Sequence, residues 1–273
     1  MFIYNWAVEK LIAGIWNDLN DKVSREELVF LRKCFRAYSS RGHMKNVVED
    51  LAVMQKYTPP PGKVLDFGCG IGLQAYLLAH LGYDVYGLET VEDKSLDGFL
   101  KGKAETHIKS REESMRGVWE TIRKKARVHF QFYDGRNIPF PNGHFEIVLA
   151  YAVFEHIPPK EVPNIIKGVG RVLKPGGILY VFQLPQRTSY TEFVARRLGL
   201  ESHEYLWSHS SINEALAGNG FKIKFYKQVD MMINHPDKVV NPLFPVLKTV
   251  NKVLLKTPLA YFAHHLTVVA EKR

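Results

Sequence analysis

Apolar residues recur along this chain in two patterns, one typical of amphipathic helices and one typical of buried strands. Steps of three and four residues predict helices in the first 57 positions and over 73–81 and 162–173. Residues 91–127 predict a helix, a loop and a second helix, with one apolar stripe formed by Met115, Val118, Trp119 and Ile122. Short apolar runs predict strands at 63–67, 84–89, 128–133, 145–150 and 178–182. Because strands and helices alternate, the pattern predicts a mostly parallel sheet that is covered by helices.

The end of the chain departs from this alternation. Two apolar runs, 221–226 and 266–271, predict two more strands, and the insertion 230–264 between them is longer than a hairpin needs. Within the insertion, Pro245 and Pro258 bracket a predicted basic amphipathic helix. We therefore expect an antiparallel pair of strands at one side of the sheet, with an added helix before the last strand.

The proline-rich stretch 58–62 divides the chain into two expected domains. Before it, residues 1–57 predict a helical N-terminal cap. After it, residues 58–273 predict one α/β domain that contains the insertion 230–264. A helical cap of this kind either closes over a ligand pocket or only packs against the sheet, and the pattern does not choose between these.

A glycine-rich turn follows the first predicted strand. Gly68, Gly70 and Gly72 cannot continue the strand, and they suit a tight turn where the backbone approaches a ligand and a helix begins. The dinucleotide-binding motif would need a third glycine at Leu73. Glu89 ends the second strand, where a carboxylate can accept hydrogen bonds from ribose hydroxyls. This residue supports a ribose-containing cofactor without identifying it.

Four segments together resemble the class I S-adenosylmethionine-dependent methyltransferases. The D-x-G-x-G-x-G run at 66–72 resembles the first motif of that family, and 134–148 resembles its D-x-x-x-L-P-F-x-D-x-x-F-D-x-V run. The Glu-His pair at 155–156 and the L-K-P-G-G turn at 173–177 also match. The resemblance implies a seven-stranded, mostly parallel Rossmann-like sheet with an antiparallel C-terminal hairpin. It also implies that the cofactor is S-adenosylmethionine.

The resemblance also assigns roles to individual residues. The glycine turn would hold the methionine and ribose part of the cofactor, Glu89 the ribose hydroxyls and Asp134 the adenine amino group. The residues implied to bind the cofactor are Asp66, Gly68, Cys69, Gly70, Gly72, Glu89, Asp134, Gly135 and Tyr151.

Four residues are candidates for acid–base chemistry. Glu155 and His156 follow the fourth strand, and a carboxylate beside a histidine can orient it and raise its pKa. His203 and His209 lie in the segment after the fifth strand, which covers the acceptor pocket in the family that the chain resembles. A purely structural role for the Glu155–His156 pair stays open. The spacing of the histidines and of the two cysteines predicts no metal site and no disulfide.

These features predict an enzyme that methylates an oxygen, nitrogen or carbon atom. The expected acceptor is a small molecule, a glycan or a lipid-linked compound. Three alternatives stay open: an RNA methyltransferase, an NAD-dependent oxidoreductase and a non-catalytic protein that kept the fold. The sequence lacks an Asn/Asp-Pro-Pro-Tyr motif, which argues against the RNA methyltransferase. It also lacks the third glycine of the dinucleotide-binding motif, which argues against the oxidoreductase. The oligomeric state is left open.

Charge adds one further hypothesis. The formal net charge is +9, and the segment 222–273 holds nine Lys or Arg against three Asp or Glu. An anionic substrate, a nucleic acid, an anionic membrane surface and a simple solvated face all suit such an excess. The predicted helix at 245–258 is the candidate for peripheral membrane contact. The first 19 residues lack a secretory-signal pattern, so the expected compartment is the cytoplasm.

Overall fold

The computed structural model describes residues 2–19, 25–90, 104–200 and 202–273. Two compact units are present, Met1–Asn137 and Ile138–Arg273. The strands of both units belong to one seven-stranded sheet with the order β3-β2-β1-β4-β5-β7-β6. This order, with the antiparallel strands at the end of the chain, confirms the predicted fold class.

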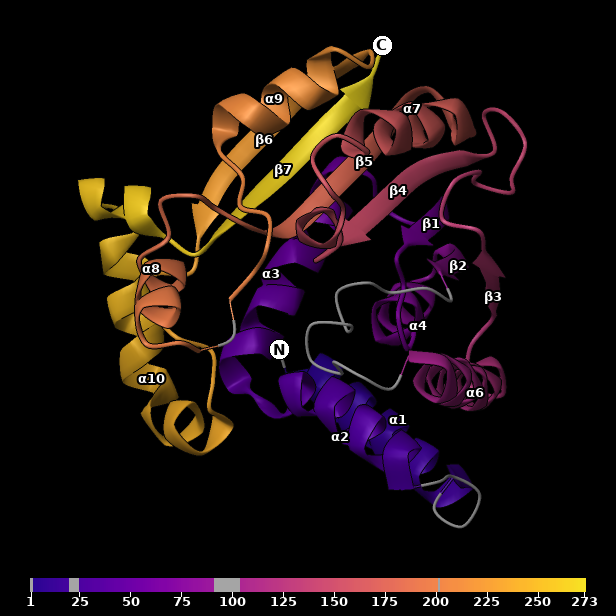
Figure 1. Cartoon of the computed structure of the whole chain (residues 1–273), viewed down its shortest axis with the longest axis horizontal. Helices are drawn as coiled ribbons and strands as arrows, with labels where there is room; N and C mark the ends of the chain where they lie inside the picture. Colours follow the sequence, from indigo (N-terminus) through magenta and orange to yellow (C-terminus); the bar gives the residue numbers. More distant parts are fainter. Residues whose placement is uncertain (1, 20–24, 91–103, 201) are drawn as a thin grey trace. The chain divides into compact units, whose positions relative to one another are not determined.

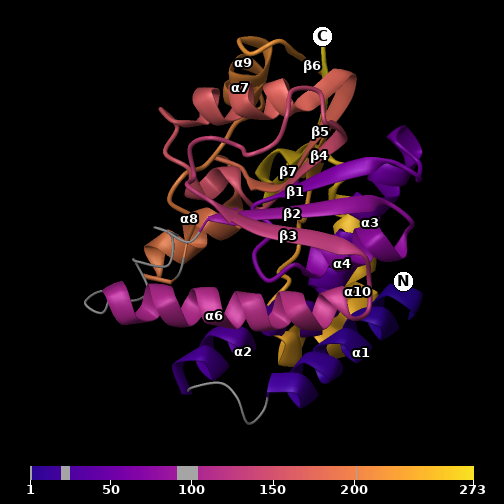
Figure 2. The same ribbon diagram turned by 90° about the vertical axis from the view of Figure 1, so that its right-hand side faces the viewer.

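The first unit combines three parallel strands with helices. Its elements are α1 (Phe2–Leu19), α2 (Arg25–Ser39), α3 (Arg41–Tyr57), β1 (Lys63–Phe67), α4 (Leu73–His80), β2 (Asp84–Thr90), α6 (Ala104–Arg123) and β3 (Val128–Tyr133). Strand β2 pairs in parallel with both β1 and β3. Helices α1 and α2 pack against α6, on the side of α6 that faces away from these strands (Figure 2).

Apolar burial explains why the helices of the first unit form where they do. The predicted stripe on α6, Met115, Val118, Trp119 and Ile122, is buried. In β1 the four residues from Val64 to Phe67 are all buried, as a strand covered on both faces requires. Between α2 and α4, the Tyr38 hydroxyl donates to Gln74 Oε1 at 2.5 Å. The N-terminal helices are therefore attached to the helix that follows the glycine turn.

In the second unit β4 and β5 pair in parallel, and one further strand, β7, runs in the opposite direction to its neighbours. Its elements are β4 (Phe145–Tyr151), η1 (Phe154–His156), α7 (Val162–Val172), β5 (Leu173–Pro185), α8 (Tyr190–Arg197), α9 (His209–Ala217), β6 (Phe221–Val229), α10 (Asp237–Leu254), η2 (Pro258–Phe262) and β7 (His265–Lys272). Strand β7 lies between β5 and β6 and is antiparallel to both (Figure 1). The expected C-terminal hairpin is confirmed.

Strand β5 begins earlier than the sequence predicts. It starts at Leu173, so the L-K-P-G-G run expected as a turn before the strand is part of it. The register with β4 shifts here, because Phe145 faces Leu173 while Ile147 faces Ile178. Four residues of β5 therefore stand opposite one residue of β4. A Cβ atom on Gly177 would lie 2.9 Å from the Lys174 carbonyl oxygen, so glycine is sterically required at this irregularity.

The helix of the insertion also differs from its predicted bounds. It runs from Asp237 to Leu254 and contains Pro242 and Pro245, instead of lying between Pro245 and Pro258. Pro258 begins the short helix η2. Proline is unfavourable inside a helix because it lacks an N–H donor, and so the sequence pattern placed the start of the helix too late. No helix in the described part of the chain is both long and apolar enough to cross a membrane.

Candidate functional site

The predicted glycine turn lies in the first unit, between β1 and α4. Gly68, Gly70 and Gly72 have φ angles of 73°, 51° and 84°, which side chains other than glycine rarely adopt. The backbone N–H groups of Gly68 and Cys69 donate to the carbonyl oxygen of Leu88 in β2, at 2.8 and 3.1 Å. These bonds fix the turn to the neighbouring strand before α4 begins.

Packing requires glycine at position 72 as strictly as conformation does. A Cβ atom there would lie 2.6 Å from Phe130 Cζ and 3.2 Å from Ile122 Cδ1. Gly72 also precedes α4 as its N-cap residue, with no side chain to accept a hydrogen bond from the helix. One of the first N–H groups of α4, that of Ala75, hydrogen-bonds to the Asp66 carboxyl group instead.

Glu89 connects the turn to the end of β2. Its Oε2 atom accepts a hydrogen bond from Gly70 N at 2.6 Å, and its Oε1 atom accepts one from Thr90 N at 2.7 Å. The structure thus brings together two residue groups that the sequence assigned to one cofactor. A ribose bound here would meet a carboxylate that is already oriented by backbone donors.

Trp119 supports the turn in a way that sequence reasoning did not identify. Its indole Nε1–H donates to the Gly70 carbonyl oxygen at 3.0 Å. The ring is also stacked on Phe130, with centroids 4.9 Å apart and planes 5° apart. The helical pattern predicted Trp119 only as a core residue, because nothing local in the sequence links α6 to the turn.

Asp66 is a buried acid with an unused oxygen. The side chain is 1 % exposed, and its Oδ2 atom has no hydrogen-bond partner among the described residues. Burial, assisted by the charge of Glu89, raises the pKa of Asp66 to about 7. Asp66 is therefore a buried carboxyl group with one unpartnered oxygen, close to a second acid, Glu89, and to the start of α4. This arrangement fits a ligand that brings a positive charge, as a sulfonium or ammonium group does.

Two other predicted cofactor residues have contrasting surroundings. Cys69 is buried, and this burial raises the pKa of its thiol well above the ordinary value. The thiol is therefore protonated at neutral pH and acts as a small apolar group. Gly135 has a φ angle of 73° and follows the end of β3.

Asp134 is exposed and is held by its own loop. Its Oδ1 atom accepts hydrogen bonds from the backbone N–H groups of Asn137 and Arg136, at 2.9 and 2.8 Å. These bonds lower the pKa of Asp134, so the carboxylate is charged at neutral pH. An ionised and oriented acceptor is what an exocyclic amino group of a base requires.

The second unit gathers residues at the ends of four strands. Tyr151 ends β4 and pairs with Phe182 of β5, while Pro185 at the end of β5 and Val229 at the end of β6 both pair with His265. Segments that leave β4, β5 and β6 therefore meet the start of β7 at one edge. Chain connection alone does not predict this meeting, which depends on strand register. Tyr151, a predicted cofactor residue, lies half-buried at this edge.

We call the titratable residues at this edge the histidine–carboxylate cluster. It comprises Glu155, His156, Glu192, His203, Asp230, His264 and His265. Sequence reasoning identified Glu155, His156 and His203. It did not identify Asp230, His264 and His265, which belong to no motif, and it gave Glu192 only as one of the polar residues after the fifth strand that could contact the acceptor.

Glu155 and His156 form the part of the cluster that the sequence singled out. Glu155 is 1 % exposed, and burial raises its pKa to about 7, while the nearby His203 opposes the rise. Its Oε1 atom lies 4.0 Å from His156 Nε2, in a side chain that is exposed to solvent. The rings of His156 and His203 are 6.5 Å apart between centroids. An accessible imidazole beside a carboxyl group can accept or return a proton near neutral pH.

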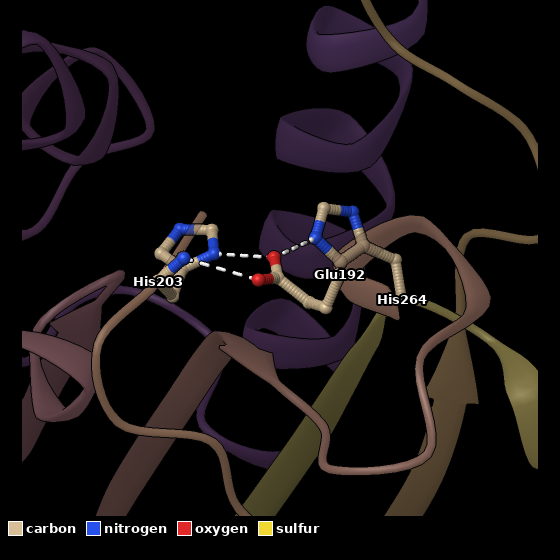
Figure 3. Close-up of side chains that lie close together, drawn as sticks. All are labelled: Glu192, His203 and His264. Atoms are coloured by element: carbon tan, nitrogen blue, oxygen red, sulfur yellow. Dashed lines mark hydrogen bonds and ion pairs between the residues drawn. The ribbon is translucent and has the colours of Figure 1, made fainter. Parts of the chain in front are cut away.

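Glu192 lies between two histidines (Figure 3). Its Oε1 atom is 2.7 Å from His203 Nδ1 and 2.9 Å from His264 Nε2. Its Oε2 atom accepts a hydrogen bond from the backbone N–H of His203 at 3.0 Å. Burial by itself would raise the pKa of Glu192, but the contacts with His203 and His264 hold it far below its usual range. Glu192 is therefore a permanent anion at physiological pH.

His265 and Asp230 complete the cluster. His265 Nδ1 lies 3.0 Å from Asp230 Oδ2, and the ring stacks on His264 with centroids 3.7 Å apart. Burial and the neighbouring His264 lower the pKa of His265 to about 4, although Asp230 opposes this shift. His265 is consequently neutral at pH 7, and it packs against the His264 ring.

His209 stands apart from these contacts. It begins α9, is exposed, and its ring packs on Tyr226 of β6 with centroids 4.2 Å apart. The described contacts do not place it beside any carboxylate of the cluster. Of the four predicted acid–base residues, the structure therefore brings together Glu155, His156 and His203.

The sequence was compared with protein families and with known proteins. A family model described as "Methyltransferase domain" matches residues 38–224. An uncharacterized methyltransferase of Synechocystis is 28 % identical over 180 residues, which cover 64 % of this chain and 72 % of that protein. The 2-methyl-6-phytyl-1,4-hydroquinone methyltransferase of Synechocystis is 33 % identical over 132 residues. That match covers 48 % of this chain and 35 % of the hydroquinone enzyme.

A solved structure with the same fold carries a bound product of the cofactor. It is magnesium protoporphyrin IX methyltransferase from Synechocystis with bound S-adenosylhomocysteine. The TM-score is 0.54 at 17 % identity, over 85 % of this chain and 84 % of that one. At this identity the similarity establishes the fold.

Proposed function

This chain belongs to the methyltransferase family, and we propose that it transfers a methyl group from S-adenosylmethionine to an oxygen, nitrogen or carbon atom of a small-molecule acceptor. The observation that carries this proposal is the unpartnered Oδ2 atom of Asp66, buried beside Glu89 and the glycine turn. A cationic cofactor would place a positive charge near this buried carboxyl group.

The residues that would hold the cofactor are those of the first unit. Gly68, Gly70 and Gly72 allow its close approach, Glu89 would accept hydrogen bonds from the ribose, and Asp134 from the adenine amino group. Cys69 and Gly135 complete the proposed set in this unit, and the assignment of Tyr151, which belongs to the second unit, stays a prediction. The cofactor itself supplies an electrophilic methyl group on a positively charged sulfur.

We propose His156 as the group that removes a proton from the acceptor, with Glu155 as its positioning residue. His156 is exposed and lies 4.0 Å from the buried Glu155 carboxyl. A proton that leaves the acceptor oxygen or nitrogen would pass to the imidazole, whose electron pair forms the new N–H bond. Methyl transfer also requires that the reacting atoms are aligned and that water is excluded. The rest of the rate enhancement would therefore come from the positioning of cofactor and acceptor.

Titration with two nucleotide ligands tests the cofactor. Calorimetry should show one S-adenosylhomocysteine bound per chain and no binding of NADH at the same concentration. The reverse result would replace the proposal by the oxidoreductase alternative. A protein that binds S-adenosylhomocysteine but transfers no methyl group to any fraction of a cell lysate would be the non-catalytic alternative.

A labelled-methyl experiment identifies the class of acceptor. Labelled S-adenosylmethionine, the purified chain and a fractionated lysate are incubated, and label is followed into small-molecule, glycan, lipid and nucleic-acid fractions. We expect it in one of the first three. Label in RNA, together with strongly salt-dependent RNA binding, would favour the nucleic-acid alternative.

A lipid-linked acceptor has specific support from α10. Five large apolar side chains of this helix are exposed, and they recur at steps of four and three residues: Val239, Leu243, Val246, Val250 and Val253. Lys248, Lys252 and Lys256 are exposed on the same segment. Exposed apolar side chains together with lysines suit the surface of an anionic bilayer. We propose that this segment contacts such a surface.

Vesicle sedimentation tests the membrane proposal. The chain should sediment with vesicles that contain phosphatidylglycerol and stay in solution with vesicles of phosphatidylcholine alone. Replacing Val246, Val250 and Val253 by serine should abolish sedimentation, since these side chains are already exposed and their loss should leave the fold intact. Sedimentation that survives the triple replacement would contradict the proposal.

A further inference from the structure

Glu192, His203 and His264 bring three metal-ligand side chains to one point. We propose that these residues bind a divalent transition-metal ion of the zinc type. One possible ligand atom of each residue lies within 4.8 Å of those of the other two. Among the described residues, this is the group of three metal-binding side chains that meets this condition. The three residues come from α8, from the loop before α9 and from the residue that precedes β7. Spacing along the sequence does not reveal the site, because the residues are 11 and 72 positions apart.

The ligand atoms already converge. His203 Nδ1 and His264 Nε2 approach the same carboxylate oxygen, Glu192 Oε1, at 2.7 and 2.9 Å (Figure 3). Zinc binds imidazole nitrogen and carboxylate oxygen at about 2.0–2.2 Å, so a small outward shift of the side chains would admit the ion. Glu192 is 5 % exposed, while the two histidine side chains are 32 % and 21 % exposed. The carboxylate ligand is therefore buried, whereas the two imidazole ligands are partly exposed.

Contacts outside the three ligands hold each of them in place. Ser189 Oγ accepts a hydrogen bond from the Glu192 backbone N–H, which fixes the start of α8. Arg196 Nη2 donates to the His203 carbonyl oxygen at 2.8 Å. The His264 backbone N–H donates to the Asp230 carbonyl oxygen at 2.7 Å, and the His264 ring stacks on His265. Ligands that are held by neighbouring bonds lose less entropy when an ion binds.

The chemistry of the ligands selects the class of ion. Two imidazoles and one carboxylate are the protein ligands of many catalytic zinc sites, which keep a further position open. Magnesium and calcium prefer oxygen ligands and would leave the imidazoles unused. The single negative charge of Glu192 also leaves a bound divalent ion with net positive charge, so it would attract an anionic or hydroxyl-bearing molecule.

The site extends the proposed function and rests on it only in one respect. If the acceptor of methyl transfer has a hydroxyl group, that oxygen could occupy the open position and become more acidic. The rings of His203 and His156 are 6.5 Å apart, so a coordinated acceptor would lie near the proposed proton acceptor. Metal binding itself needs neither cofactor nor acceptor.

Direct metal titration tests the inference. The full chain is stripped with a chelator and titrated with Zn²⁺ by calorimetry and with Co²⁺ by visible absorption. We expect one ion per chain, the intense visible bands of low-symmetry cobalt, and release of protons that increases as the pH is lowered. S-adenosylmethionine and acceptor are absent, so failure here would leave the methyltransferase proposal standing, and its own test uses S-adenosylhomocysteine alone.

Matched variants identify the ligands. Glu192→Gln, His203→Gln and His264→Gln should each weaken binding by about 100-fold or more, since loss of a direct ligand should cost at least as much as loss of an outer contact. His129→Gln is the control, because His129 is an exposed histidine of β3 that packs on Tyr86. Thermal melting without metal shows whether each variant is folded. The inference is overturned if the original chain binds no stoichiometric Zn²⁺ or Co²⁺, or if any of the three folded variants binds as tightly as it does.

Discussion

The glycine turn of the first unit and the histidine–carboxylate cluster of the second unit are built in opposite ways. Asp66 to Gly72 are contiguous, and Glu89, near the end of the next strand, accepts a hydrogen bond from Gly70. The cluster draws on positions from 155 to 265 and on the ends of four strands. A site for a common cofactor can be encoded locally, whereas the site that acts on a particular acceptor depends on loops that differ between relatives.

The acids of the two regions also have opposite electrostatic surroundings. Asp66 lies buried in the first unit with Glu89 nearby, and burial and this neighbouring charge raise its pKa to about 7. Glu192 lies in the second unit between two imidazoles, and its pKa is held far below the usual range. The first region is therefore suited to a cationic ligand, and the second to an exchange of protons or to a metal ion.

The largest expected effect separates the two regions by function. His156→Gln should lower the turnover number by about 10²–10⁴-fold, because a positioned proton acceptor contributes about that much. The affinity for S-adenosylhomocysteine should stay unchanged. Labelled-methyl transfer to the accepting fraction and calorimetry measure the two quantities. Full turnover in this variant would show that the Glu155–His156 pair is structural.

Gly72→Ala should damage the first region by packing. The new Cβ would lie 2.6 Å from Phe130 Cζ, in a residue with a φ angle of 84°, so we expect the free energy of unfolding to fall by about 3 kcal/mol. Gly176→Ala is the matched control, because Gly176 has a φ angle of 72° but nothing within 4 Å of its Cβ position. It should cost about 1 kcal/mol. Thermal melting compares the two variants. If both lower the melting temperature by the same amount, the Phe130 ring moves aside without a cost in stability.

Asp66→Ala and Asp134→Ala should each weaken S-adenosylmethionine binding by about 1–3 kcal/mol. Asp66 would lose its interaction with the cationic part of the cofactor, and Asp134 its hydrogen bond with the adenine. Calorimetry measures both, with Glu204→Ala, an exposed acid of the second unit, as control. If both variants bind as the original chain does, the two assigned roles are wrong.

The titration of Asp66 should have a smaller effect, and it should change cofactor affinity and protein stability in opposite directions. Only its ionised form attracts a cation, so cofactor affinity should fall about tenfold or more from pH 7.5 to pH 5.5, through the pKa of about 7. The stability of the cofactor-free protein should change in the other direction. The raised pKa stabilises the fold fully below the unfolded value of 3.8, and this stability is lost as the pH rises through about 7.

Asp66→Asn separates this effect from other titrations. The amide keeps the shape of the side chain and cannot ionise, so both pH dependences should flatten in this range. Calorimetry and thermal melting at several pH values measure them. An unchanged pH dependence of binding in Asp66→Asn would assign the titration to another group.

Periodicity and motifs predicted most of the fold. The strands at 63–67 and 128–133 have the expected bounds, and the antiparallel pair at the end of the chain is confirmed. The resemblance to class I methyltransferases is also confirmed, by the family match and by the strand order. The division at residues 57 and 58 stays a prediction. The start of β5 and the bounds of α10 were wrong, because a β-bulge and prolines inside a helix are tolerated only with support from tertiary contacts.

The sequence alone determined the residues whose partners are their near neighbours: the buried strand, the glycines after it and the acids that end strands. A backbone that must turn sharply allows only glycine, and this requirement is visible without a structure. Only the tertiary structure decided that Trp119 bonds to Gly70 and that Glu192 lies between His203 and His264. These contacts depend on how strands align and how helices pack, and the information for them is spread over the whole chain instead of any single segment.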